Sequence, residues 1–143
     1  MALTKSFLKV THQDCIAKVE GTGGPITINL TTDLLPLSGQ VVDGATQVVN
    51  INGVSWTGTN NAEITITRNN VVVMTLPSTG SNYLDFDNSQ MTPETTENTY
   101  PLVVTIVGTQ GEVWIRLKKV SGYRSTIENA TYGAYDDPTI ING

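Results

Sequence analysis

Apolar and polar residues alternate with a period of two over long parts of this chain. In the segment EITIT, residues 63–67, isoleucines alternate with threonines, and in VWIRLK, residues 113–118, apolar residues alternate with Trp114, Arg116 and Lys118. Successive side chains of a β-strand point to opposite faces of a sheet. The pattern therefore predicts strands that bury one face, and an all-β protein.

Further strands are predicted at PITINL, QVVNINGVSW and NYLDFD, and residues 6–11 and 15–20 are predicted to form an N-terminal hairpin. The clusters GTGG, LSGQ, VDGA, TGTNN and STGSN are predicted to be the turns between strands. The only helix candidate is a single turn at TPETTEN, residues 92–98. Such spacing is typical of a sandwich or barrel. We predict one antiparallel, Ig-like β-sandwich over residues 1–123, in which 1–20 form an N-terminal hairpin or arm, followed by an irregular, extended C-terminal arm over 124–143.

Two long hairpins are predicted. In AEITITRNNVVVMTL, a three-residue loop, Asn69–Val71, would place Val72, Met74 and Leu76 on the face of Ile64 and Ile66, whereas a two-residue Asn-Asn turn would place them opposite the threonines. We favour the longer loop. In YPLVVTIVGTQGEVWIRLKKV, the GTQG segment is predicted to reverse the chain, with apolar residues on one face of both strands: Leu102, Val104, Ile106, Val113, Ile115 and Leu117.

The charge balance restricts the classes of partner. The chain carries 8 Lys and Arg against 13 Asp and Glu, with a net charge of −5. Binding to a phosphate backbone draws on clustered Lys and Arg, so we expect no nucleic-acid partner. No apolar run approaches the roughly 20 residues that span a bilayer, and we expect no membrane partner. One cysteine forms no internal disulfide, and the N-terminus lacks the apolar block of a signal peptide, so we expect a product of the cytoplasm.

The segment THQDC, residues 11–15, holds the only histidine and the only cysteine. A structural zinc site needs four ligands, and no second Cys or His pair exists. A nucleophilic cysteine needs a histidine held against it, but residues three apart on an extended strand point to opposite faces, so His12 and Cys15 would diverge. The segment is predicted to be a polar turn followed by a buried thiol.

Other candidate sites are weaker. Asp85, Asp87 and Asn88 lack the spacing of a helix–loop–helix calcium site, and nothing singles out two carboxylates among Asp85, Asp87 and Glu112 for glycoside hydrolysis. Trp56 and Trp114 could form a sugar-stacking platform, but we expect them to be core residues. We therefore predict no catalytic residue, no metal, no cofactor and no enzymatic activity.

The last twenty residues lose the alternating pattern but keep aromatic and apolar side chains. A segment of this kind is either disordered or lies across a partner. The residues predicted to contact a partner are Tyr123, Tyr132, Tyr135, Ile140 and Ile141.

Three segments carry a resemblance: the WTG start, the TRNNVVV segment and the ending LKKVSGY, which together cover residues 48–123. They resemble small virion structural proteins of tailed bacteriophages, particularly those that infect marine cyanobacteria. The resemblance implies a non-enzymatic component of the phage particle, made in the host cytoplasm and located in the virion. It offers no catalytic residue to transfer.

The resemblance and the residues lead to one expected function and two alternatives. The first is a capsid decoration or accessory protein that binds the assembled major capsid protein or other virion proteins, with 124–143 and 1–20 as contacts and a homo-oligomer as a further option. The second is a structural or adaptor subunit of the tail, neck or fibre. The third is a carbohydrate-binding adsorption module that uses Trp56, Trp114 or the tail tyrosines.

Overall fold

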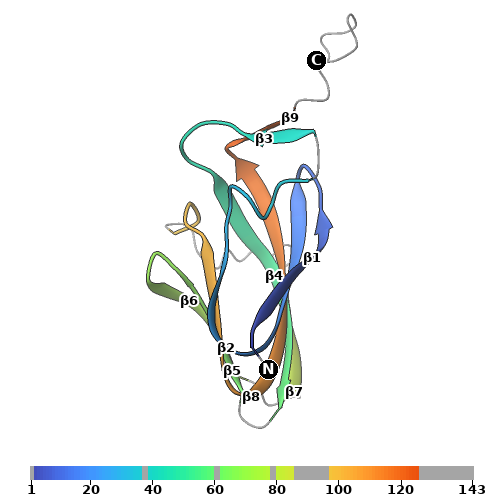
Figure 1. Cartoon of the computed structure of the whole chain (residues 1–143), viewed down its shortest axis with the longest axis vertical. Helices are drawn as coiled ribbons and strands as arrows, with labels where there is room; N and C mark the ends of the chain where they lie inside the picture. The colour runs from blue at the N-terminus through green and yellow to red at the C-terminus, as the bar shows by residue number, and fades with distance from the viewer. Residues whose placement is uncertain (1, 37–38, 60–61, 78–79, 86–96, 126–143) are drawn as a thin grey trace, which may run out of the picture.

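The computed structural model describes residues 2–36, 39–59, 62–77, 80–85 and 97–125 (Figure 1). They form nine strands and no helix, which confirms the predicted all-β fold. The strands are β1 (Thr4–Val10), β2 (Asp14–Ile28), β3 (Gln40–Val42), β4 (Val48–Thr59), β5 (Glu63–Arg68), β6 (Val71–Pro77), β7 (Gly80–Asp85), β8 (Leu102–Ser121) and β9 (Tyr123–Ser125). The predicted helical turn at 92–98 falls largely outside the described residues.

Seven strands form one antiparallel sheet. Five of them follow the order β1-β2-β8-β4-β7, while β5 pairs with β8 and β6 pairs with β5. Strands β3 and β9 form a separate antiparallel pair. The N-terminal hairpin, β1–β2, is confirmed, with Val10 paired to Cys15 next to the turn.

Strand β8 is continuous over 20 residues, so the predicted hairpin at GTQG is wrong. Its first part pairs with β5 and its last part with β4, while β2 pairs with it along both parts. The glycines allow the strand to bend without reversing, since Gly108 has a φ of 114°. In β2 the GTGG segment, also predicted to be a turn, lies beside this bend, with Gly21 paired to Gly111 and a register shift on its far side.

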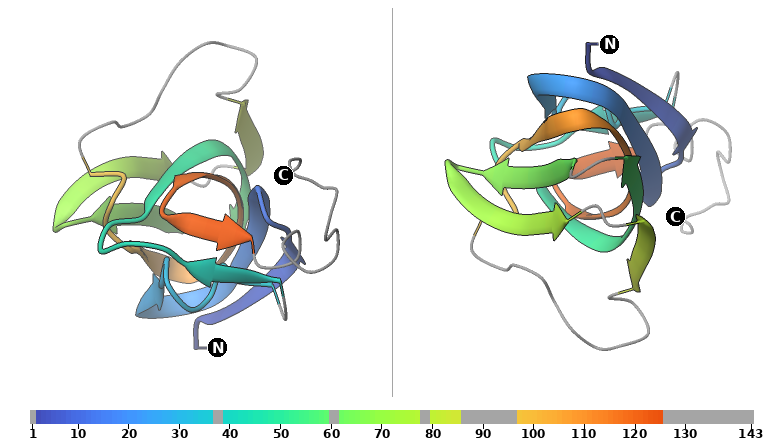
Figure 2. Two further views of the ribbon diagram at one scale, coloured as in Figure 1. Left: turned by 90° about the horizontal axis from the view of Figure 1, so that it is seen from above. Right: turned by 90° about the horizontal axis from the view of Figure 1, so that it is seen from below.

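The bend folds the sheet over a single core. A Cβ at Gly111 would lie 3.1 Å from the Cγ2 of Ile106, so a larger residue there would require the Ile106 side chain to shift by a few tenths of an ångström. The predicted apolar face of β8 is confirmed, because its residues are all fully buried: Leu102, Val104, Ile106, Val113, Ile115 and Leu117. They form one cluster with buried residues of β2, β4, β5 and β6. In views along the long axis, the strands curve around a common centre (Figure 2).

The hairpin β5–β6 has the two-residue turn, so the favoured three-residue loop is wrong. Asn69 and Asn70 have φ values of 54° and 61°, the left-handed pair that suits a tight hairpin turn. A bulge then shifts the register, because Ile66 pairs with Met74 while Thr67 pairs with Val72. The extra residue returns Met74 and Leu76 to the buried face of Ile64 and Ile66, as predicted, but leaves Val72 exposed.

Arg68 occupies a core-facing position at the end of β5 and is fully buried. Its guanidinium donates to three backbone carbonyls: Tyr100 at 2.8 Å, Val49 at 2.8 Å and Asn98 at 3.0 Å. These bonds replace the water that the charge loses on burial. Arg68 thereby fastens the segment that leads into β8 to strands β4 and β5.

Strand β9 continues the chain past the predicted domain end at residue 123. Val41 pairs with Arg124 and Gln40 with Ser125. The first two residues of the predicted C-terminal arm are therefore part of a strand. Residues 126–143 lie outside the described residues.

Candidate functional site

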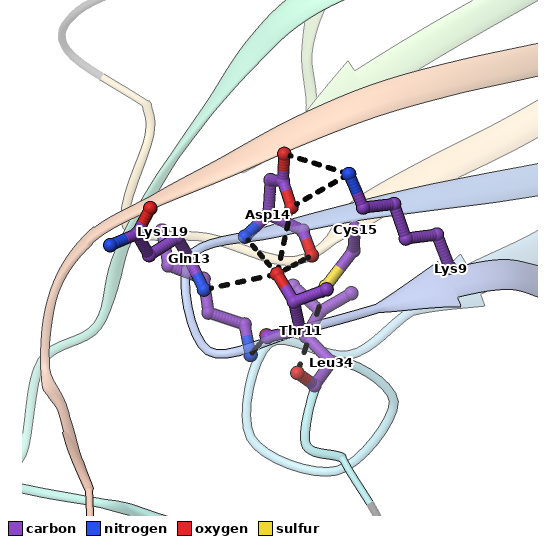
Figure 3. Close-up of polar contacts among 7 residues, drawn as sticks. All are labelled: Lys9, Thr11, Gln13, Asp14, Cys15, Leu34 and Lys119. Atoms are coloured by element: carbon purple, nitrogen blue, oxygen red, sulfur yellow. Dashed lines mark hydrogen bonds and ion pairs between the residues drawn. The ribbon is translucent and has the colours of Figure 1, made fainter.

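The segment THQDC is a turn, as predicted (Figure 3). The Thr11 backbone N–H donates to the Asp14 carbonyl at 2.9 Å, and the Thr11 hydroxyl donates to the Asp14 carboxylate at 2.7 Å. The backbone N–H of Asp14 donates back to the Thr11 hydroxyl at 3.0 Å. The Thr11 hydroxyl is the main reason that the pKa of Asp14 is lowered. The polar atoms of the turn therefore satisfy one another.

Cys15 and His12 lie in different environments. Cys15 is fully buried in the apolar core, and its thiol lies 3.7 Å from the Leu34 carbonyl oxygen. Burial raises the pKa of this thiol and so disfavours its thiolate form. His12 instead lines a polar hollow of about 130 Å³ together with Gln40, Lys119 and Tyr123. The two side chains are thus not brought together as a nucleophile and its base.

Lys119 closes this polar hollow from the core side. It stands in phase with the buried residues of β8 and is itself buried. Its ammonium donates to Gln40 Oε1 at 2.6 Å and to the Thr11 carbonyl at 2.9 Å, and it lies 4.9 Å from the centroid of the Tyr123 ring. Burial lowers the pKa of Lys119. The side chain ties together the N-terminal turn, β3 and the end of β8.

Tyr123, predicted to contact a partner, has internal contacts in the structure. Its hydroxyl donates to the Leu30 carbonyl at 2.5 Å, and its half-buried ring packs against the core. Burial raises the pKa of Tyr123 to about 12. Its contact with a partner stays a prediction. The other predicted contact residues lie outside the described residues: Tyr132, Tyr135, Ile140 and Ile141.

The two tryptophans have different places. Trp56 is 5% exposed and its indole N–H donates to the Pro77 carbonyl at 3.0 Å, so its predicted core position is confirmed. Trp114 is 43% exposed, and its predicted core position is wrong. Side chains alternate between the two faces along β8. Trp114 stands between the buried Val113 and Ile115, so it points to the opposite face.

Trp114 belongs to a row of residues that crosses four strands. Strand pairing aligns Lys18 of β2, Trp114 of β8, Ser55 of β4 and Tyr83 of β7. Tyr83 is 58% exposed, and the small Ser55 stands between the two aromatic residues. Two shallow hollows of about 240 Å³ each lie here and share Ser55 and Trp114. We call Ser55, Tyr83, Glu112, Trp114 and Arg116 the outer aromatic face.

Charged groups of both signs border the outer aromatic face. The indole N–H of Trp114 donates to the Glu112 carboxylate, which fixes the orientation of the ring. At the other border, the Arg116 guanidinium lies over Gly53, where a Cβ would come within 2.7 Å of Nη2. Lys18 and Glu20 form an ion pair at 2.8 Å, and this hydrogen bond is the main reason that the pKa of Lys18 is raised.

A second exposed apolar feature is the edge at β6. Val71 and Val72 are 45% and 57% exposed, and β6 carries no charged residue. Within the described residues, β6 pairs only with β5, and the hairpin stands out from the side of the sheet (Figure 1). The opposite edge, β1, differs, because it carries Lys5 and Lys9 and has a bulge between Phe7 and Lys9.

No group of three or more His, Cys, Asp or Glu side chains in the described ranges could hold a metal ion. Those ranges also contain no helix long and apolar enough to cross a membrane. Asp87 and Asn88 lie outside them. Comparison with known protein families and with curated proteins gives no match for this chain.

Part of the outer aromatic face could be predicted from the sequence. Alternation in residues 113–118 already placed Trp114 and Arg116 on one face, opposite the apolar residues. It did not indicate Tyr83, because that residue reaches Trp114 only through the pairing of β7 with β4 and of β4 with β8. No local pattern records such pairings between distant strands.

Proposed function

We propose that this protein is a non-enzymatic structural component of a tailed bacteriophage particle, a decoration protein that binds the assembled major capsid protein. The observation that carries the proposal is the apolar edge at β6. The resemblance over residues 48–123 supports the same function. One core enclosed by a folded antiparallel sheet also supports the Ig-like sandwich as part of this proposal.

The edge strand β6 offers two kinds of contact to another chain. An edge strand presents backbone N–H and C=O groups that can pair with a further strand. Val71 and Val72 add apolar side chains at the turn end of this edge. Proteins usually protect edges with charges, as β1 does with Lys5 and Lys9. An edge without charge is therefore suited to being covered in an assembly.

The valines alone are too small for a stable complex. Full burial of one valine contributes about 1.5–3 kcal/mol, and a stable interface covers about 800 Å² on each partner. We therefore propose that residues 1–20 and 124–143 add further contacts on the shell. A shell that binds the folded domain at many sites is itself stabilised by mass action.

The test measures occupancy on purified capsids. Val72→Lys places a charge on the apolar edge and is expected to lower occupancy at least about tenfold, because the charge loses its water on binding. Val120→Lys is the matched control, since Val120 is a similarly exposed valine at the far end of β8. Equal occupancy of both variants and the unaltered protein would refute the role of β6.

A second experiment addresses the arm and the position in the particle. Deletion of 126–143, which leaves strand β9 in place, is expected to abolish attachment while the free domain keeps its circular dichroism spectrum. Normal occupancy after the deletion would remove the arm from the proposal. Quantitative mass spectrometry of particles is expected to find copies in proportion to the capsomers, whereas a few copies per particle would place the protein in the tail, neck or fibre.

A further inference from the structure

We propose that the outer aromatic face binds a neutral oligosaccharide whose sugar rings stack on Trp114 and Tyr83. This function is separate from attachment through β6 and does not depend on it. Trp114 and Tyr83 come from β8 and β7, and Ser55 of β4 stands between them on the same face of the sheet.

The spacing of the two aromatic residues suits a chain of sugar rings. Neighbouring strands lie about 4.8 Å apart, so residues two strands apart are separated by about 10 Å. Two linked pyranose rings span a similar length, so two rings separated by one intervening ring can stack on Trp114 and Tyr83. The small Ser55 leaves room between them, where the two hollows meet. The C–H groups of a pyranose face carry partial positive charge and are attracted to the negative face of an aromatic ring.

The border of this face supplies the polar contacts that a sugar needs. Sugar hydroxyls both donate and accept hydrogen bonds. The Glu112 carboxylate accepts on one side of Trp114, the Arg116 guanidinium donates on the other, and the Ser55 hydroxyl does both. The bond from the Trp114 indole to Glu112 uses only part of the carboxylate's capacity. This bond restrains the ring before any ligand binds, which lowers the entropy cost of binding.

The local charges favour a neutral sugar over an acidic one. Around Trp114, Lys18 and Arg116 are balanced by Glu20 and Glu112, and the whole chain carries −5. An anionic polysaccharide would therefore find no net attraction here and would be repelled at a distance. A neutral oligosaccharide meets no such repulsion.

The experiment titrates the full chain with neutral hexaoses of the cello-, malto-, chito-, manno- and xylo- series, and with polygalacturonate as the acidic probe. Binding is followed by tryptophan fluorescence and calorimetry. At least one neutral hexaose is expected to bind and to protect Trp114 from quenching by acrylamide. Trp114→Ala is expected to weaken this binding at least about tenfold, and Tyr83→Ala several-fold.

Two variants keep the result interpretable. Tyr100→Ala, at an exposed tyrosine outside this face, is expected to bind as the unaltered protein does. Trp114→Phe keeps an aromatic ring and is expected to restore part of the affinity. Trp56 is buried and remains in both Trp114 variants, so its emission reports that they are folded.

Three outcomes would overturn the proposal. The first is the absence of binding to every neutral hexaose at millimolar concentration, and the second is binding that Trp114→Ala leaves unchanged. The third is tighter binding of polygalacturonate than of any neutral probe. Self-association that Trp114→Ala abolishes, without sugar binding, would assign the face to a second copy of the chain instead. None of these results bears on capsid occupancy, which the Val72→Lys variant measures separately.

Discussion

The ammonium of Lys119 lies 4.9 Å from the centroid of the Tyr123 ring, at the point where β8 leaves the sheet for β9. Burial moves the two groups in opposite directions, because it lowers the pKa of Lys119 and raises that of Tyr123 to about 12. In both cases burial favours the neutral form. The stability of this end of the domain is therefore expected to change with pH in the alkaline range.

We predict that Tyr123→Phe flattens the alkaline loss of stability. Above pH 10 the unfolded chain loses the Tyr123 proton, while the folded chain keeps it up to about pH 12. Stability from this group therefore falls as pH rises through that window, by up to about 2–3 kcal/mol. Lys119 has the opposite effect, because between its lowered pKa and 10.5 the unfolded state binds more protons. Comparison of the variant with the unaltered protein isolates the Tyr123 contribution.

Urea unfolding at pH 8 and pH 11 measures this difference. The variant is expected to be less stable by about 1 kcal/mol at pH 8, since it loses the hydrogen bond to Leu30, and to lose less stability on going to pH 11. Tyr100→Phe, at an exposed tyrosine, is the control. The same loss in Tyr123→Phe as in the unaltered protein would contradict the prediction.

Arg68→Met is predicted to destabilise the domain by about 3–5 kcal/mol. The substitution fills similar space but removes the Arg68 donors from the buried Val49 carbonyl and from the part-buried carbonyls of Asn98 and Tyr100, of which Asn98 keeps the Val49 N–H as a donor. Urea unfolding at neutral pH measures the loss. Arg116→Met, on the outer face of β8, is the matched control and is expected to change stability by less. A cost below about 1 kcal/mol for Arg68→Met would show that water replaces these bonds.

The sequence predicted faces well and connections poorly. Alternation placed the core residues of β5 and β8 correctly, because the period of two follows directly from strand geometry. It did not distinguish a turn from a bend at Gly108 and Gly111, since glycines serve both. Pairing with β2 determines that β8 bends and does not reverse, because β2 pairs with β8 on both sides of the bend. Strand β2 is distant from β8 in sequence. The position of Trp114 followed from the same alternation, but that of Tyr83 beside it did not.

The close approach at Gly122 gives a matched pair of substitutions. Gly122 and Gly44 have φ values of 91° and 92°, so alanine is strained equally at both. A Cβ at Gly122 would lie 2.5 Å from the Thr46 carbonyl oxygen, whereas one at Gly44 meets nothing within 4 Å. We predict that Gly44→Ala costs about 1 kcal/mol and Gly122→Ala at least about 2–3 kcal/mol.

Thermal and urea unfolding of the two alanine variants test this difference. The gap between them isolates the backbone contact, since the strain at positive φ is shared. Equal costs would show that the loop at Thr46 moves away from Gly122 at little expense.

Cys15 is predicted to be inert in the folded protein. Its thiol is fully buried and its pKa is raised, so little thiolate is present or accessible. Reaction with an aromatic disulfide reagent at pH 8 is expected to be at least about a hundredfold slower in the folded protein than in urea. Comparable rates in both states would show that the core opens at Cys15 and would revive the question of a reactive cysteine.

The shared bend of β2 and β8 has a mechanical consequence. Both strands run through the two parts of the sheet, so the part that contains β5 and the part that contains β4 share the same two central strands. Loss of β2 or β8 from one part would expose backbone groups in the other part. The domain is therefore expected to unfold as one cooperative unit. A force applied at one end of the domain would be transmitted to the other end through β2 and β8, its two longest strands. The two parts of the sheet would not separate at a hinge between them.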